Sequence, residues 1–271
     1  MKGSALVLAG VVLAATLALP PNLAAQDGGD FLLQFLEATD EDDAALLGVL
    51  QADEDLRTVI SDVNGTVMLP LNVPIQFGPG HEGEVYYDSN ETRIYISFGF
   101  IWDVMQLFYD AGDFDLENQD AEVASKILPV VYETVLHEMA HALIDLHDIP
   151  THGQSGEEVA DQLVVFIVSD FYDDDETINA ILVPVVNQYI YRNNANRGAD
   201  AEPSEHPLDL DRALNYVCWL YGSNPDTFDF LGATLEEGGR STDDCPEAYY
   251  SLMVDWSDRL APYWFTWEDG R

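Results

Sequence analysis

Two histidines and a glutamate occur together in one apolar stretch of the chain, in the pattern His137-Glu138-x-x-His141. The residues around them, from Val135 to Ile144, are mostly apolar and favour a helix, which is therefore expected to be buried. Positions four apart lie one turn apart on the same helix face, so both imidazoles point the same way. Buried imidazoles need polar partners, and this requirement limits what the chain can fold into.

The same spacing is typical of helices that hold one zinc ion between two histidines. Glu138 lies about 100° around the helix from His137, which places it beside a metal-activated water rather than on the metal. Zinc lowers the pKa of that water toward neutrality, and a glutamate in this position takes its proton as general base. The alternative is a pair of structural histidines on a core helix, and a third ligand would decide between the two interpretations.

His147 is one candidate for the third ligand. It stands six residues after His141 and fits the extended pattern H-E-x-x-H-x-x-G-x-x-H, in which the chain turns sharply at the glycine. This chain has Ile144 at the glycine position, and a β-branched residue is poorly suited to that turn. If the helix continues instead, His147 lies on another face and ends the helix. The sequence therefore disfavours His147 as a ligand.

The second candidate is an acidic segment that opens the following helix. Ser155 and Glu158 form the S-x-x-E pattern of a capping box, in which the glutamate reaches back to the serine backbone amide. The cap does not use Glu157, and a short turn between antiparallel helices would bring it past His141. Asp161, four residues later on the same face, can bind a ligand histidine from behind. We predict Glu157 as the third ligand and Glu158 as the fallback; an acidic helix start favoured by the helix dipole is the alternative.

The rest of the chain predicts an α+β fold. Apolar residues from Asp30 to Val63 recur at helical spacing between acidic residues. Prolines and glycines interrupt the next stretch, in which residues 85–87 and 93–97 flank a turn and predict a β-hairpin. A kink or restart is expected at Pro129 and at Pro184. Helical segments are predicted near residues 100–110, 121–147, 157–171, 176–191, 208–222 and 246–260. A small sheet followed by a helical body is an α+β arrangement.

The N-terminal residues have the three parts of a secretory signal peptide. Lys2 is followed by an apolar run from Ala5 to Leu19 and by the small residues Ala24 and Ala25, which predict cleavage after Ala25. The run is short for a bilayer span, so no stable membrane anchor is expected. We predict residues 1–25 as the signal peptide and residues 26–271 as a single exported domain, periplasmic or secreted.

Cysteine content and charge agree with export. The two cysteines, Cys218 and Cys245, predict one disulfide, because an exported chain meets an oxidising environment and no further cysteine could complete a metal site. With 10 Lys and Arg against 50 Asp and Glu, the formal net charge is −40. A field of this sign repels nucleic acid and anionic lipid, so neither is an expected partner.

The segment from Leu136 to Leu163 resembles a bacterial metallopeptidase family known as a domain of unknown function. The resemblance rests on H-E-M-A-H-A-L, a short loop with Gly153, and E-E-V-A-D-Q-L. It continues beyond this segment in the predicted hairpin and in the downstream residues Glu205-His206, Arg212 to Asn215, and Cys218. The resemblance implies a zincin fold with a zinc site made of two histidines and one glutamate, and it implies no particular substrate.

His206 is a further candidate that such a zinc site brings into view. In zinc peptidases with a glutamate ligand, a histidine or tyrosine from the later helical part donates to the developing oxyanion. His206 stands late enough in the chain for this role. A histidine in a surface loop between Glu205 and Pro207 is the favoured alternative.

Together these features predict an exported zinc-dependent metallopeptidase that acts on peptide or protein substrates. One zinc ion would be held by His137, His141 and Glu157, with Glu138 as the catalytic base and Asp161 in support. Two alternatives stay open. One is a catalytically silent zincin-fold protein that binds a peptide or partner, and the other is a helical domain without a metal.

Overall fold

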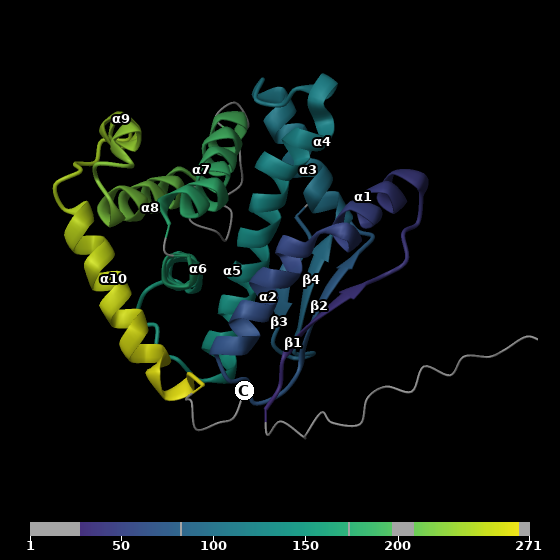
Figure 1. The fold of residues 1–271 in the computed structure, drawn as a ribbon, viewed down its shortest axis with the longest axis horizontal. Coiled ribbons are helices and arrows are strands. Elements are labelled where there is room, and N and C mark those ends of the chain that lie inside the picture. The colour runs from purple at the N-terminus through teal and green to yellow at the C-terminus, as the bar shows by residue number, and fades with distance from the viewer. Residues whose placement is uncertain (1–27, 82, 173, 197–208, 266–271) are drawn as a thin grey trace, which may run out of the picture.

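The computed structural model describes residues 28–81, 83–172, 174–196 and 209–265. A four-stranded sheet lies along one side of the molecule and a helical body along the other (Figure 1). The helix α5 (Leu128–Leu146) stands between them. The predicted α+β class is thus confirmed, with the helix of the His-Glu-x-x-His pattern at the centre.

The sheet has the strand order β1-β2-β4-β3. Three strands run parallel, and the fourth pairs antiparallel with β4 at the edge: β1 (Phe31–Phe35), β2 (Val73–Gly78) and β4 (Arg93–Ser97), then β3 (Val85–Asp88). The predicted hairpin is therefore confirmed as β3 and β4, with Tyr87 opposite Ile94. The edge strand β3 contacts α5, which brings the end of the sheet to the central helix.

The prediction of helix from Asp30 onward is wrong for its first part. Residues Phe31–Phe35 form β1, which pairs with β2 in parallel, and their side chains alternate between more buried and exposed. Such a short apolar run fits a helix or a strand equally well, and the pairing with β2 decides between them. The predicted helical character is found further on, in α1 (Glu41–Ala52) and α2 (Glu54–Thr66).

The predicted helical segments after residue 100 are confirmed, with shifts at their ends. Besides α5, the long helices are α3 (Phe98–Asp110), α6 (Gly156–Phe171), α7 (Asp175–Asn196), α8 (Asp209–Ser223) and α10 (Cys245–Leu260). Short elements join them: η1 (Leu116–Asn118), α4 (Gln119–Glu122), the π-helical turn η2 (Val123–Ile127), η3 (Asp229–Leu231), α9 (Gly232–Glu237) and η4 (Ala261–Tyr263).

The two prolines inside predicted helices behave differently. Pro129 lies in the first turn of α5, directly after η2, so the helix restarts there as predicted. A proline is tolerated in a first turn because its missing N–H has no helical partner there. In contrast, α7 continues through Pro184 without a restart.

The central helix α5 is buried on nearly all sides. Every residue from Leu128 to Ala140 is buried, because α6 and α7 pack against the helix and β3 and β4 contact it from the sheet. A helix of this kind is stable only when other elements surround it. Its polar exceptions are Glu133, Thr134, His137 and Glu138, and buried groups of this type need partners.

A disulfide connects α8 to the start of α10 in the helical body. Cys218 of α8 is bonded to Cys245, the first residue of α10, with an S–S distance of 2.01 Å, which confirms the predicted pairing. The predicted signal peptide, residues 1–25, lies outside the described residues. Among the helices described, none combines the length and apolar character needed to cross a bilayer.

Candidate metal centre

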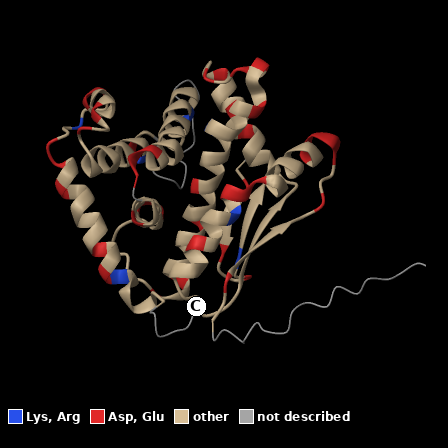
Figure 2. Ribbon diagram, in the orientation of Figure 1, with Lys and Arg blue, Asp and Glu red and all other residues tan. Residues whose placement is uncertain are grey.

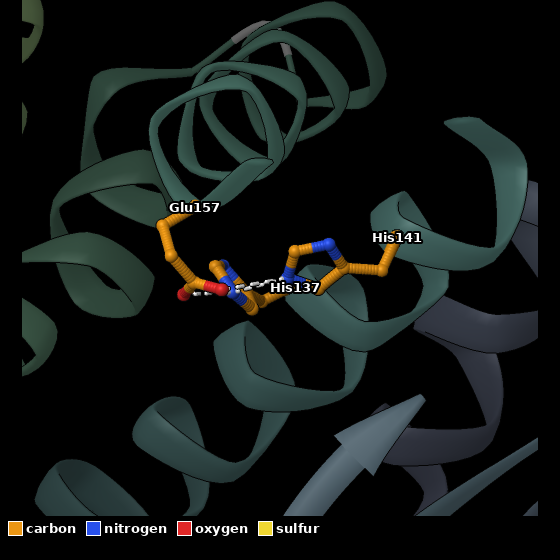
Figure 3. A group of neighbouring side chains, drawn as sticks. All are labelled: His137, His141 and Glu157. Carbon is orange, nitrogen blue, oxygen red and sulfur yellow. Dashed lines mark hydrogen bonds and ion pairs between the residues drawn. The ribbon is translucent and has the colours of Figure 1, made fainter. Parts of the chain in front are cut away.

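The side chains of His137, His141 and Glu157 converge between α5 and α6 (Figure 3). The Nε2 atoms of His137 and His141 lie 3.1 Å apart. Nε2 of His137 lies 3.2 Å from Oε2 of Glu157, and Nε2 of His141 lies 3.4 Å from Oε1 of the same carboxylate. His137 is buried, whereas the other two side chains are partly exposed. The three residues predicted as ligands therefore form one cluster, named here the His–His–Glu group.

The spacing of the His–His–Glu group suits a tetrahedral metal site. Zinc binds imidazole nitrogen and carboxylate oxygen at about 2.0–2.2 Å, so neighbouring ligand atoms in a tetrahedral site lie about 3.4 Å apart. The separations of 3.1, 3.2 and 3.4 Å are close to this value. Two imidazoles and a carboxylate are also a ligand set that zinc uses in catalytic sites. The residues present therefore fit one zinc ion.

A short loop between α5 and α6 brings Glu157 to the histidines. Asp148, His152 and Gly153 have φ values of 50°, 52° and 85°, in the left-handed region that glycine adopts without strain. Ser155 then begins α6 by accepting a hydrogen bond from the Glu158 backbone N–H at 3.1 Å. The capping residue predicted from the sequence thus sets the first turn of α6, which carries Glu157.

Glu158, the fallback ligand, has different partners. Its carboxylate accepts a hydrogen bond from the Gln154 side chain at 3.3 Å. Within the described ranges, Glu158 is not part of the His–His–Glu group, and the expected bond from the Ser155 backbone amide to its carboxylate is not formed. The structure therefore brings Glu157, and not Glu158, to the two histidines.

His147 lies away from the His–His–Glu group. Its Nε2 donates to the Met68 carbonyl at 2.8 Å, and its ring stacks on Tyr263 with 3.9 Å between the centroids. The helix continues through Ile144 to Leu146, so the sharp turn that would return His147 to the site is absent. His206, the candidate oxyanion donor, lies outside the described residues.

Asp161 contacts His137 from the other side of the ring. Its Oδ1 lies 2.9 Å from Nδ1 of His137, which can donate its proton there and turn the Nε2 lone pair toward the His–His–Glu group. Arg212 of α8 donates twice to the same carboxylate, at 2.8 Å from Nε to Oδ2 and 2.5 Å from Nη2 to Oδ1. Burial by itself raises the pKa of Asp161, but Arg212 and His137 hold it below its ordinary value. The carboxylate therefore stays ionised.

A second buried carboxylate, Glu133, lies one turn before His137 on α5. Tyr216 of α8 donates a hydrogen bond to its Oε1 at 2.6 Å. Burial raises the pKa of Glu133, and His137 and Arg212 offset this only in part. Arg212 also lies over the ring of Tyr189 from α7, 4.5 Å from the guanidinium carbon to the ring centroid. Residues of α7 and α8 thus close the buried side of the site.

The residues that support the site, Glu133, Arg212, Tyr189 and Tyr216, could hardly be predicted from the sequence. Glu133 gives one signal, because it is a charged residue one turn before His137 in an apolar stretch. Arg212 enters only through the family resemblance. Tyr189 and Tyr216 give no local signal, because the packing of α7 against α5, and of α8 against α6 and α7, brings them to the site.

Glu138 lies beside the His–His–Glu group and is 6% exposed. Burial raises the pKa of its carboxyl group, and the nearby histidines counteract this only in part. The backbone of Tyr87, on the edge strand β3, also acts to lower the pKa of this carboxyl group. Glu138 is thus held between the histidines and the edge of the sheet.

A family model with the description "Putative metallopeptidase" (DUF4344) matches residues 35–260. The chain belongs to this family. The match extends from the last residue of β1 through α10, so it includes every residue of the site described above. No curated protein and no solved structure matches the chain. The family resemblance seen in the sequence is confirmed, and the family's description implies a metal and the hydrolysis of peptide bonds.

In this DUF4344 protein a pocket of about 400 Å³ borders the site. His137, Glu138 and Glu157 line it on one side, and Val85, Phe100 and Arg192 are among the residues that line the rest. Its volume falls in the range of pockets that enclose small ligands or parts of larger ones. The His–His–Glu group therefore borders a space that can receive part of a substrate.

Proposed function

We propose that this chain is an exported zinc peptidase, with His137, His141 and Glu157 as zinc ligands and Glu138 as the general base. The proposal rests on one observation: three side chains converge beside a buried carboxylate, with separations of 3.1, 3.2 and 3.4 Å between their ligand atoms. Three protein ligands leave a fourth coordination position for the reacting groups. Membership of a metallopeptidase family supports the same class of reaction.

The residues around the ion would divide the chemistry among them. Zinc, when bound, would polarise the peptide carbonyl and make a nearby water easier to deprotonate. Glu138 would accept the proton of the attacking water and pass it to the leaving amine, and the raised pKa of its buried carboxyl group makes it a stronger base for the first transfer. Asp161 would keep His137 in the tautomer whose Nε2 faces the ion.

The edge of the sheet offers a place for the substrate backbone. β3 is one of the two edge strands in the order β1-β2-β4-β3, and it contacts α5, the helix that carries Glu138. An extended peptide that added to this edge would gain main-chain hydrogen bonds and run past the His–His–Glu group. This placement supports a peptide or protein as the substrate.

Export of residues 26–271 as one domain is part of the proposal. The disulfide between Cys218 and Cys245 suits an oxidising compartment. The charged and apolar N-terminal residues have the pattern of a cleaved signal peptide. Both observations support a periplasmic or secreted enzyme.

The substitution Glu138→Gln tests the assignment of the general base. We expect peptide hydrolysis to fall by roughly 10³-fold, because the amide cannot accept the proton of the attacking water. Zinc content, measured by elemental analysis, should not change. Glu247→Gln removes an exposed carboxylate of α10 and should leave hydrolysis intact as the control.

Two outcomes would change the proposal. Retained peptidase activity in Glu138→Gln would exclude Glu138 as the base. Wild-type protein that binds zinc and peptides but hydrolyses none of a broad peptide library would instead be a catalytically silent zincin-fold binding protein.

A further inference from the structure

Polar side chains of α7 line the pocket beside the His–His–Glu group, Gln188 and Arg192 among them. Gln188 and Arg192 stand four residues apart, so they lie one turn apart on the same face of the helix. Neither belongs to the His–His–Glu group or to the contacts of Asp161 with His137 and Arg212. Their position in the pocket therefore needs a separate explanation.

Gln188 is almost completely buried at the pocket. It is 3% exposed, and among the described residues no hydrogen-bond partner is present for its side-chain amide. Its amide atoms are not fully enclosed, so they face the open pocket and can bond to water or to a ligand there. A ligand group that bonded to this amide would replace that water.

Arg192 provides a positive charge at the same place. Its Nη2 donates to Asp103 Oδ2 at 3.4 Å, and the Asp103 side chain is 38% exposed. A guanidinium group has five N–H donors, and among the described residues this long contact is its one hydrogen bond, which leaves most of the donors available to a ligand. Arg212, the other arginine of the pocket, already has its charge balanced by Asp161.

Because the molecule as a whole is strongly acidic, a basic side chain such as Arg192 is one of few places that attract an anionic group. Acidic residues occur along most helices, and basic residues are few (Figure 2). With 50 acidic residues against 10 basic ones, most of the surface repels an anionic group. Glu133, Glu138 and Glu157 also line this pocket, so a carboxylate that enters it would be attracted at Arg192 and at the proposed zinc ion.

We propose that this pocket selects a substrate carboxylate close to the scissile bond, and this inference rests on the proposed peptidase function. Arg192 would form a charge-assisted hydrogen bond with the carboxylate, and the amide of Gln188 would donate to it as well. Val85 and Phe100 line the pocket with apolar surface that suits a methylene stem. The carboxylate belongs to an Asp or Glu side chain or to the C-terminus of the peptide.

Binding to the zinc-loaded Glu138→Gln protein tests the inference without turnover. The probes are blocked alanine heptapeptides that carry a single Glu or Gln at each position in turn, and a Gln peptide with an unblocked C-terminus. Isothermal titration should give about tenfold tighter binding for the Glu peptide at one position, or for the unblocked C-terminus, than for its neutral partner. Which probe shows the preference identifies the source of the carboxylate.

Substitutions in the same background connect that preference to the pocket. Arg192→Met should reduce it to less than about twofold, and Gln188→Leu should reduce it in part. Arg240→Met is the matched control, because its side chain is 35% exposed against 31% for Arg192 and also pairs with an aspartate, Asp211. This control removes the same charge elsewhere and should leave the preference unchanged.

The outcomes separate the pocket from the peptidase activity. Equal binding of Glu and Gln peptides, no peptide binding at all, or a preference that survives Arg192→Met would overturn the carboxylate pocket. A preference in binding without hydrolysis by the wild-type protein would keep the pocket and reject the peptidase. Hydrolysis by the wild-type protein without any carboxylate preference in binding would keep the peptidase and reject the carboxylate pocket.

Discussion

At the scale of single residues, His137 carries the strictest demand because both of its ring nitrogens have partners. Nε2 lies 3.1 Å from His141 and 3.2 Å from Glu157, while Nδ1 lies 2.9 Å from Asp161. Asp161 is 1% exposed and is balanced by Arg212. A carboxylate in this position fixes the ring's orientation and tautomer and makes it a better ligand. The His–His–Glu group therefore depends on a residue that would not touch the ion.

The substitution Asp161→Asn should lower zinc affinity by about 10- to 100-fold. The amide keeps the shape of the side chain but loses the charge that orients His137 and balances Arg212. Competition with a chromophoric chelator measures the affinity, and circular dichroism checks that the variant is folded. Asp258→Asn, at an exposed position of α10, should bind zinc like the wild type. Unchanged affinity in Asp161→Asn would contradict the supporting role.

At the scale of elements, the end of α5 determines how the chain returns to the site. His147 follows the last residue of α5, and its contacts with Met68 and Tyr263 connect this helix end to two distant parts of the chain. Tyr263 also donates from its hydroxyl to the His147 carbonyl at 3.1 Å. Burial lowers the pKa of the His147 ring, and the hydrogen bond to Met68 offsets this only in part. The ring therefore stabilises this helix end in its neutral form.

His147 should make stability depend on pH in a defined direction. Its pKa in the folded protein lies below the unfolded value of about 6.5. The neutral ring therefore contributes fully to the free energy of unfolding above about pH 6.5, and this contribution is lost as the pH falls toward the folded pKa. Urea unfolding measures the free energy of unfolding of the wild type and of His147→Gln. The difference in favour of the wild type should be larger at about pH 7.5 than at about pH 5.5. Comparing the two proteins removes the titration of the carboxylates that they share. The same difference at both pH values would contradict the assignment.

At the scale of the whole molecule, the parts of the site that are local in sequence are the parts that could be predicted. His137, Glu138 and His141 lie within about one turn of α5, and Glu157 follows after a short loop, in the first turn of α6 that Ser155 caps. Arg212, Gln188 and Arg192 reach the site on α7 and α8, and no local pattern says which residues of those helices will face α5. Their positions follow from packing around a helix that is buried on nearly all sides.

The sheet shows the same limit. The hairpin of β3 and β4 could be predicted, because its two strands are separated only by a short turn. β1 pairs with β2, and two helices separate these strands in the sequence. The run Phe31–Phe35 is too short for its spacing to distinguish a strand from a helix. The long-range pairing with β2 therefore determines that this run is a strand, which the local sequence could not predict.

A crystal structure of the zinc-loaded protein, with diffraction data collected at the zinc absorption edge, tests the central claim most directly. We expect a single anomalous peak about 2.0–2.2 Å from Nε2 of His137, Nε2 of His141 and a carboxylate oxygen of Glu157. The absence of a peak between these three side chains, or a peak held by other residues, would contradict the proposed zinc site.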